Sequence, residues 1–580
     1  MSNKTACPLD CYDACEIIFD NQKLRGVKEG HTQGFLCPHL NHYEKHATIQ
    51  TPRYKGEEIS LDVALEKLKV MLQSCAKNKI LHYRGSGNFA LMQEVTDHFF
   101  ASYGAVLTEG SLCDGAGEEG IKQGRGSNKT MPIHEIAKSE VVVFWGRNPH
   151  TTSSHLLPLI KGKTIIVIDP IKTPIARMAD LHIQLKPHTD QFLAMLLARF
   201  LHIESGYDKE FLQKYASGCE EYYELTQNLR IKAVLEQMDV SLGQLGDFLR
   251  LVKDKRAAFV CGVGVQKYHD GADVMRSIDA LAAMLGLFGK EGCGVSYLGA
   301  SRANIASPFY TQSKKVSKVL TEFSSFDTVF IQGANPLSQM PDSNRVRASM
   351  ERVKNIVYFG LFENETSEVA DLVIPAKSFL YKDDVRTSYS HNRISFMPKV
   401  AETDAGISEY DLSAYLCREF GIDLQSEEFY INHFKSFAVQ KIDGLLYVDK
   451  REEIPYANGF DTKDGEFVFL DEIDSKIDEN EGLHLITSKS PTSLNSQFHR
   501  QESVYLHSSL GFREGEMVSV TSVSGSVRLS VRHNNDLRSD CVLIYSGTKG
   551  VNNLTPSKHA LSAKSAIFQE NKVEVRKWTV

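Results

Sequence analysis

The chain has 580 residues, of which 42% are hydrophobic and 24% charged, a composition typical of globular proteins and unlike that of disordered or fibrous ones. Its length predicts about four domains of ~150 residues each. The net charge is −7 at pH 7 without long blocks of like charge, so the composition indicates neither a nucleic-acid partner nor an anionic membrane surface. Apolar runs such as Val141–Trp145 are far shorter than the ~18 residues of a membrane-spanning helix, so we expect no membrane insertion.

Four of the 11 cysteines lie within the first 37 residues, at positions Cys7, Cys11, Cys15 and Cys37. The residues before Cys7 contain no twin-arginine or apolar signal, which predicts a cytoplasmic protein, and disulfides are disfavoured in that compartment. The spacing lacks the Cys-x2-Cys knuckles of structural zinc sites. Four clustered thiolates are the ligand set of a cubane iron–sulfur cluster, and we predict a 4Fe-4S cluster here.

The following elements predict a β-rich lobe and then an α/β region. Residues 16–28 alternate apolar and polar side chains like a β-hairpin beside the cysteines. From Asp62 to Ala370, helical patterns such as residues 63–72 alternate with short buried strands, which indicates a doubly wound α/β architecture with parallel sheets. The predicted strands are Lys79–Tyr83, Glu140–Trp145, Thr164–Ile168, Ala257–Cys261, Thr328–Ile331 and Ile356–Phe359.

Several of these strands end in glycine-bearing or polar turns, where open α/β sheets bind their ligands. The turn at 146–149, Gly-Arg-Asn-Pro, resembles the turn at 333–336, Gly-Ala-Asn-Pro. The repeated turn indicates two similar nucleotide-binding units.

The last third of the chain changes character twice. Residues 423–480 are acidic and weakly patterned, and we expect them to be connective. From Leu483 onward β-strand patterns dominate, which predicts a C-terminal β-barrel or sandwich. The strands expected there are Leu483–Thr487, Met517–Ser522, Ser526–Val531 and Cys541–Tyr545.

The N-terminal motif, Cys-Pro-Leu-Asp-Cys-Tyr-Asp-Ala-Cys followed by Gly34-Phe-Leu-Cys-Pro, resembles the start of the molybdopterin oxidoreductases, the dimethyl-sulfoxide-reductase family. Further motifs similar to those of the family follow in the family's order at 109–117, 145–149, 168–190, 262–266, 333–337, 365–375, 487–498 and 551–555. The resemblance implies a multi-domain α/β fold: an iron–sulfur lobe at 1–48 with parts of 376–475, α/β domains at 49–109 with 303–375 and at 110–302, and a C-terminal β-barrel dinucleotide-binding domain at 480–580.

The resemblance also implies two pterin-guanine dinucleotides that hold one molybdenum or tungsten. Glycines permit close approach to phosphate, and Asn, Asp and Glu side chains suit ribose and guanine. Taken singly, the Asn-Pro and Asp-Pro pairs are also ordinary turn formers. The expected cofactor-binding residues are Gly146, Asn148, Pro149, Asp169, Asp190, Gly262, Gly264, Gln266, Gly333, Asn335, Pro336, Glu365, Thr366, Thr487, Asn495, Ser496, Gln497, Asn552 and Asn553.

By the same resemblance, Cys113 occupies the family's metal-ligand position, where a soft thiolate would bind molybdenum or tungsten directly. A small buried cysteine is the structural alternative, and Asp114 is the alternative ligand. His39 stands where the family usually has Lys or Arg between cluster and pterin, and Arg302 is a displaced candidate for the substrate pocket.

The function that this resemblance implies is a two-electron oxidation or reduction of a small substrate, with electrons passing through the cluster to a ferredoxin-like subunit or small carrier. The alternatives are a redox-silent, hydratase-like member and a degenerate electron-transfer scaffold without molybdenum. The loop histidines His134, His150, His155 and His269 are expected to be surface or packing residues.

Overall fold

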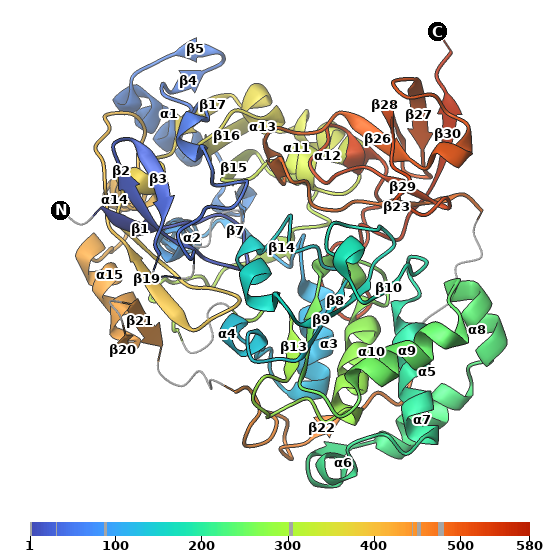
Figure 1. The fold of residues 1–580 in the computed structure, drawn as a ribbon. Coiled ribbons are helices and arrows are strands. Elements are labelled where there is room, and N and C mark those ends of the chain that lie inside the picture. Colours follow the sequence, from blue (N-terminus) through green and yellow to red (C-terminus); the bar gives the residue numbers. More distant parts are fainter. Residues whose placement is uncertain are drawn as a thin grey trace.

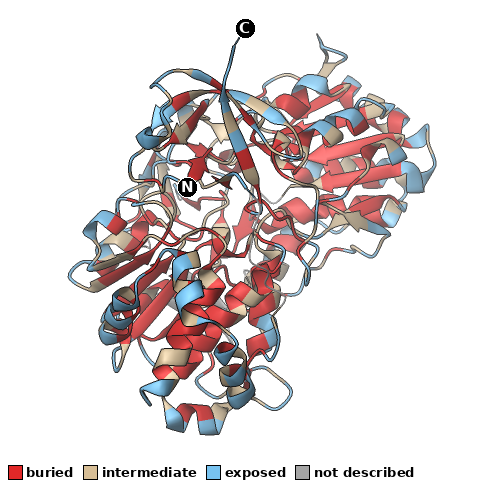
Figure 2. Ribbon diagram, turned by 90° about the vertical axis from the view of Figure 1, so that its right-hand side faces the viewer, coloured by how far each residue is buried: buried red, intermediate tan, exposed pale blue. Residues whose placement is uncertain are grey.

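The computed structural model describes residues 3–28, 30, 32–85, 90–300, 305–442, 445–448, 454–473 and 481–579 (Figure 1). The fold is α/β and multi-domain, with two mainly parallel sheets, an N-terminal three-stranded sheet and a closed C-terminal barrel. Buried residues fill the sheets and the inner faces of the helices, while exposed residues lie on the outer faces (Figure 2). Within the described residues, no helix is both long and apolar enough to cross a membrane.

The first parallel sheet has the strand order β10-β9-β8-β12-β13. Its predicted strands form where expected, because the apolar runs at these positions are buried on both faces. Pairing aligns Trp145 with Ile168 on one side and with Cys261 on the other, so the strand ends that carry the predicted turns lie side by side. The five strands are β8 (Val141–Trp145), β9 (Thr164–Ile168), β10 (Leu181–Ile183), β12 (Ala257–Cys261) and β13 (Gly294–Ser296).

The second sheet has the order β14-β7-β6-β15-β16-β17-β4-β5 and is parallel except for the β4–β5 edge hairpin. Helices α1, α2 and α14 share one apolar core with it, and α11 and α12 border the core on its other face. The strands are β4 (Arg53–Tyr54), β5 (Glu57–Glu58), β6 (Ile80–Arg84), β7 (Val106–Glu109), β14 (Lys315–Ser317), β15 (Thr328–Gln332), β16 (Asn355–Gly360) and β17 (Leu372–Pro375).

The helices around the two sheets include α1, which confirms the helical pattern predicted at 63–72. Their bounds are α1 (Leu61–Gln73), α2 (Val95–Tyr103), α3 (Gly115–Arg125), α4 (Ile133–Ile136), α5 (Asp190–Ile203), α6 (Lys209–Tyr215), α7 (Cys219–Gln227), α8 (Ile231–Met238), α9 (Leu242–Val252), α10 (Gly271–Met284), α11 (Pro336–Gln339), α12 (Ser343–Met350), α13 (Glu365–Val369) and α14 (Glu409–Phe420).

The N-terminal lobe contains the predicted hairpin, formed by β2 (Glu16–Asp20) and β3 (Lys23–Gly26), with β1 (Lys4–Ala6) added at its edge. Strand β19 (Arg393–Met397) packs beside β1, as Figure 1 shows, and β18 (Asp384–Arg386) pairs with β19. The buried guanidinium of Arg386 donates hydrogen bonds to the carbonyl oxygens of Cys7, Leu9 and Cys11. A segment near residue 386 therefore holds the cysteine loop in place.

The C-terminal strands close into a barrel of order β23-β29-β26-β28-β27-β30, which resolves the expectation of a barrel or a sandwich. Its core is a separate apolar cluster that includes Val504, Val518 and Val542. The strands are β23 (Leu483–Ile486), β26 (Ser503–Leu506), β27 (Met517–Thr521), β28 (Ser526–His533), β29 (Cys541–Leu543) and β30 (Lys572–Lys577), and the short hairpin β24 (Ser493–Leu494) and β25 (Gln497–Phe498) precedes β26.

The expectation that residues 423–480 are only connective is wrong. Helix α15 (Glu427–Ser436) begins at the capping side chain of Ser426 and buries Tyr430, Ile431 and Phe434. Strands β20 (Ala438–Ile442) and β21 (Leu445–Val448) extend the β18–β19 sheet, and β22 (Phe467–Val468) pairs with β11 (Ala216–Ser217). The acidic residues on the outer face of α15 conceal its short apolar stripe in the sequence.

Helices α3 and α10 pack closely around a buried ion pair. Arg125 donates to both carboxylate oxygens of Asp279, one at 2.7 Å, and both side chains are only 1% exposed. The guanidinium also lies 4.7 Å from the ring centroid of Phe288. At Gly120 an added Cβ would lie 2.2 Å from the carbonyl oxygen of Ala272, so this crossing requires glycine.

We predict that Asp279→Leu lowers the free energy of unfolding by about 3–5 kcal/mol, because it leaves the Arg125 charge buried without its partner. Urea unfolding followed by the fluorescence of Trp145, which is fully buried in the same domain, measures this. The double variant Arg125→Met/Asp279→Leu removes both charges, and we expect it to recover most of the loss. Equal loss in the single and double variants would contradict the assignment to an unpaired charge.

Candidate functional site

One large cavity, of about 950 Å³, brings together most of the predicted site residues. Its wall includes loop residues of the N-terminal lobe, both parallel sheets and the barrel. The predicted residues that line it are Cys11, Cys113, Asp114, Gly146, Asn148, Asp169, Asp190, Gly262, Gly264, Gly333, Asn335, Pro336, Thr487, Asn495, Ser496, Gln497 and Asn552.

Both repeated turns contribute residues to the cavity wall. Gly146 and Gly333 both have a positive φ, 61° and 53°, immediately after strands β8 and β15. A Cβ at Gly262 would lie 1.8 Å from the carbonyl oxygen of Gly146, so the neighbouring loops touch main chain to main chain. The prediction that one turn is used twice is therefore confirmed in the backbone.

The two turn asparagines have different partners. The Asn335 amide donates to Glu365 at 2.8 Å and to Ser496 at 3.1 Å, and its oxygen accepts from Thr366 at 2.9 Å. Arg500 donates to the other oxygen of Glu365 at 2.7 Å, so this network ties the barrel segment to the second sheet. Asn148, in contrast, bonds residues of its own turn, as an ordinary turn former does.

Two acidic side chains, the buried Asp169 and the partly buried Asp190, line the cavity wall. Burial, reinforced by the charge of Asp190, raises the pKa of Asp169 to about 7, although its oxygen accepts from the Ile171 amide at 2.8 Å. Burial likewise raises the pKa of Asp190 to about 6, although the Trp145 indole donates to it at 2.7 Å. Both carboxyls thus lack the donors that would fully stabilise their charged forms.

Cys113 lies directly before α3, and two contacts hold its main chain. Its amide donates to Ser111 Oγ at 2.9 Å, and its carbonyl accepts from the side chain of Gln266 at 2.9 Å. Burial, and then the carboxylates of Asp114 and Asp10, raise the pKa of Cys113 to about 12, while Lys267 and Lys489 oppose this shift. The thiol therefore needs a further positive charge before it becomes a thiolate.

The four N-terminal cysteines are close enough to raise one another's pKa. Burial first, and the neighbouring thiols as a smaller cause, raise the pKa of Cys7 to about 11 and of Cys37 to about 12. Burial, the negative charge of Asp13 and the neighbouring thiols raise the pKa of Cys11 and Cys15 further. Four thiols, two of them buried and two partly buried, that repel one another's charged forms are a donor set that a metal cluster would stabilise.

A family model described as molybdopterin oxidoreductase matches residues 57–412. The chain belongs to the molybdopterin oxidoreductase family.

Two relatives and one solved structure illustrate how far this similarity extends. Probable oxidoreductase YyaE of Bacillus subtilis strain 168 is 29% identical over 441 residues, or 69% of this chain and 66% of that protein. The assimilatory nitrate reductase catalytic subunit of the same strain is 24% identical over 66% of this chain and 63% of its own length. The chain thus spans slightly under two thirds of these relatives. Acetylene hydratase from Pelobacter acetylenicus shares the fold, with a TM-score of 0.74 at 14% identity, over 99% of this chain and 100% of that one.

The cavity of this family member fits a phosphate-bearing cofactor. A Cβ at Gly264 or Gly333 would meet no atom within 4 Å, so the main chain at both positions is open to the cavity. Among the described cavity residues, Arg147 Nε and Ser546 Oγ are buried without a hydrogen-bond partner. Such groups in a native wall indicate that a polar ligand completes the site.

Several predicted residues lie behind the cavity wall or away from it. Gln266 supports Cys113 from behind, Glu365 and Thr366 support Asn335, and neither Pro149 nor Asn553 lines the wall. His39 is buried with Nε2 3.0 Å from the carbonyl oxygen of Ser490, outside the wall. Arg302 lies outside the described residues, so its predicted place in the substrate pocket stays a prediction.

The sequence reasoning missed three charged residues beside Cys113. Asp10, Lys267 and Lys489 line the same cavity, and their charges act on the Cys113 thiol. Burial lowers the pKa of Lys267, which the charge of Cys113 partly offsets. Asp10 stands between two predicted cluster ligands and Lys267 directly follows Gln266, so their positions in motifs were the available signals.

We predict that Asp169→Asn stabilises the cofactor-free protein at pH 8 by up to about 4 kcal/mol. The pKa of Asp169 is near 7 in the folded protein and lower in the unfolded chain. The neutral carboxyl therefore makes its full contribution to stability below about pH 4, and this contribution is lost as the pH rises through 7. Thermal unfolding at pH 5 and pH 8 tests this. The variant should lose less stability between these values than the wild type, whereas Asp247→Asn, at an exposed carboxyl on α9, should match the wild type. An Asp169→Asn protein with the wild-type pH dependence would contradict the prediction.

Proposed function

We propose that this chain is a molybdenum or tungsten bis-pterin oxidoreductase that carries out a two-electron redox reaction on a small substrate. The observation that carries the proposal is that Cys113 and Cys11 line the same cavity, so the expected metal ligand and the cysteine lobe face one space. When bound, the metal supplies two-electron chemistry and the 4Fe-4S cluster supplies single-electron transfer.

The chain's own residues would hold these groups from separate elements. Cys7, Cys11, Cys15 and Cys37 would bind the cluster, and Cys113 would bind molybdenum or tungsten. The turns at Gly146 and Gly333 would admit the phosphates. The acidic pair Asp169 and Asp190 would accept hydrogen bonds from ribose or guanine groups, which would compensate their buried charge.

The cavity charges would position the substrate and the metal ligand. Lys267 and Lys489 favour the thiolate of Cys113, and Asp10 and Asp114 supply carboxyl groups beside it. Burial, followed by the charge of Glu118, raises the pKa of Asp114 to about 6, so this carboxyl can hold or release a proton near neutral pH. A ferredoxin-like subunit or small carrier in the cytoplasm would exchange electrons with the cluster.

Anaerobic purification with metal and nucleotide analysis tests the proposal as a whole. We expect about four irons, about one molybdenum or tungsten and about two GMP equivalents per chain. Turnover should require an electron acceptor or donor. Turnover without either would indicate a hydratase-like reaction instead, and a protein with iron but neither molybdenum nor tungsten would indicate an electron-transfer scaffold.

Variants of Cys113 test its role as the metal ligand. We predict that Cys113→Ala abolishes turnover but retains the iron, and that Cys113→Ser retains the metal with one sulfur neighbour fewer in X-ray absorption, because a harder oxygen replaces the thiolate. Cys219→Ser, a partly buried cysteine at the start of α7, is the matched control and should leave the metal spectrum unchanged. An unchanged sulfur count in Cys113→Ser would move the ligand assignment to Asp114.

A further inference from the structure

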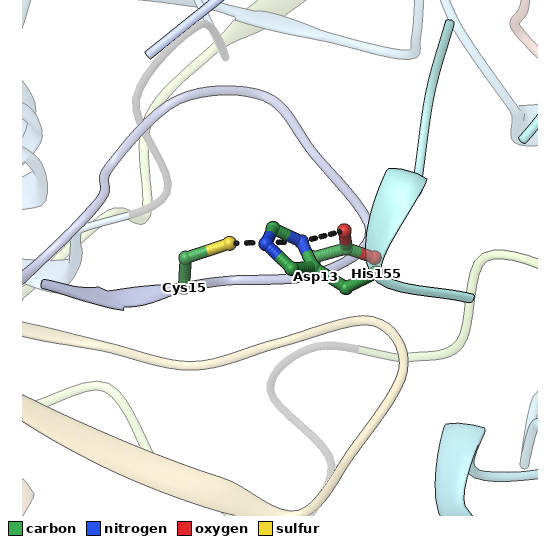
Figure 3. A group of neighbouring side chains, drawn as sticks. All are labelled: Asp13, Cys15 and His155. Carbon is green, nitrogen blue, oxygen red and sulfur yellow. Dashed lines mark hydrogen bonds and ion pairs between the residues drawn. The ribbon is translucent and has the colours of Figure 1, made fainter. Parts of the chain in front are cut away.

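A buried histidine joins Asp13 to one of the cluster cysteines, as Figure 3 shows. His155 follows β8 at the start of a short 3-10 helix, and its side chain is fully buried. Its Nδ1 lies 2.7 Å from Asp13 Oδ2 and 3.5 Å from Cys15 Sγ. His155 is therefore buried as a packing residue would be, but its ring makes polar contacts that the sequence does not reveal.

Acceptors face both nitrogens of the His155 ring. Nε2 lies 3.1 Å from the carbonyl oxygen of Phe35, and Nδ1 faces the Asp13 carboxylate. Because carbonyl and carboxylate oxygens accept, these partners assign an N–H to each nitrogen. With an N–H at Nδ1, the ring has no lone pair there for a metal ion, so the Asp13, Cys15 and His155 group is not a metal site of its own.

The contacts around the ring fix its orientation. The Phe35 ring stacks on it at a centroid distance of 4.3 Å, and Phe35 itself is 36% exposed. The side chain of Gln33 donates to the His155 carbonyl at 3.2 Å. The Nδ1 hydrogen is thus held between the Asp13 oxygen and the Cys15 sulfur.

The other three cysteines receive their hydrogen bonds from the main chain. Amides of Leu9 and Asp13 serve Cys7 and Cys11, and those of Leu40 and His39 serve Cys37. Cys15 differs because a side chain, His155, contacts its sulfur. Hydrogen bonds to cluster sulfurs favour the reduced cluster, which carries one more negative charge.

We propose that His155, oriented by Asp13, donates a hydrogen bond to the Cys15 sulfur and raises the reduction potential of the iron–sulfur cluster. The inference rests on the proposed cluster. It makes His155 a positioning and tuning residue outside the substrate cavity, since it does not line that cavity.

A potentiometric titration of the cluster, followed by electron spin resonance on the anaerobically purified protein, tests this. His155→Phe keeps an aromatic ring against Phe35 but removes both N–H groups. We expect at least a tenfold weaker equilibrium for reduction, which is a shift of at least 59 mV to lower potential for a one-electron couple. His155→Gln keeps an N–H donor and should lie between this variant and the wild type.

The control is His202→Phe, which replaces another stacked histidine, 3.5 Å from the Tyr223 ring on α5 and α7, and should keep the wild-type potential. A His155→Phe protein with full iron content and an unchanged potential would overturn the inference. A wild-type protein without iron, or with zinc in its place, would instead overturn the proposed cluster, so the two failures are distinguishable.

If His155→Phe fails to assemble the cluster, a measurement on the wild type decides the question. With 15N-labelled histidine, pulsed electron spin resonance of the reduced cluster should detect a histidine nitrogen coupling that His155→Gln lacks. No histidine coupling in the wild type, or an equal coupling in His155→Gln, would overturn the inference.

Discussion

The close contact between α3 and α10 is the constraint on which the rest of the site depends. The Cys113 loop leads into α3, and the loop from Gly262 to Gln266 leads into α10, so any change in the separation of these helices moves both walls of the cavity. Glycine at 120 lets the main chains touch, and the ion pair between Arg125 and Asp279 holds them in register. A buried ion pair is weak evidence for stability but strong evidence for a defined geometry, because neither charge tolerates another position.

The cavity concentrates groups that are costly to bury. Carboxyls, thiols and lysines from all parts of the chain lie in or beside the cavity, and their pKa values are shifted. Each shift means that the folded protein is less stable with the group in one of its two charge states. Under the proposed function, a metal cluster and phosphate-bearing ligands would supply the compensating charges and donors, and the folded state would gain stability from them by mass action.

The central strands of both sheets could be predicted because they are buried on two faces and appear as short apolar runs, whereas the more exposed edge strands β5 and β14 were not predicted. The turns at the ends of these strands are also local features of the sequence, and they allowed most of the cavity wall to be predicted. The rest depends on contacts between distant residues: Lys489 reaches Cys113 from the barrel, Arg386 reaches the cysteine loop from the second half of the chain, and Asp13 reaches His155 across the lobe boundary. No sequence period or motif spacing reveals such pairs of distant residues. The short apolar stripe of α15 was also hidden among acidic residues.

The cavity wall runs from Pro8 to Gln569, and this has a consequence for biosynthesis. A nascent chain on the ribosome presents the cysteine lobe early, but the wall is complete only after the last barrel residues have emerged and docked. Capture of a large cofactor must therefore follow translation of nearly the whole wall, and chains that stop early cannot form the complete site.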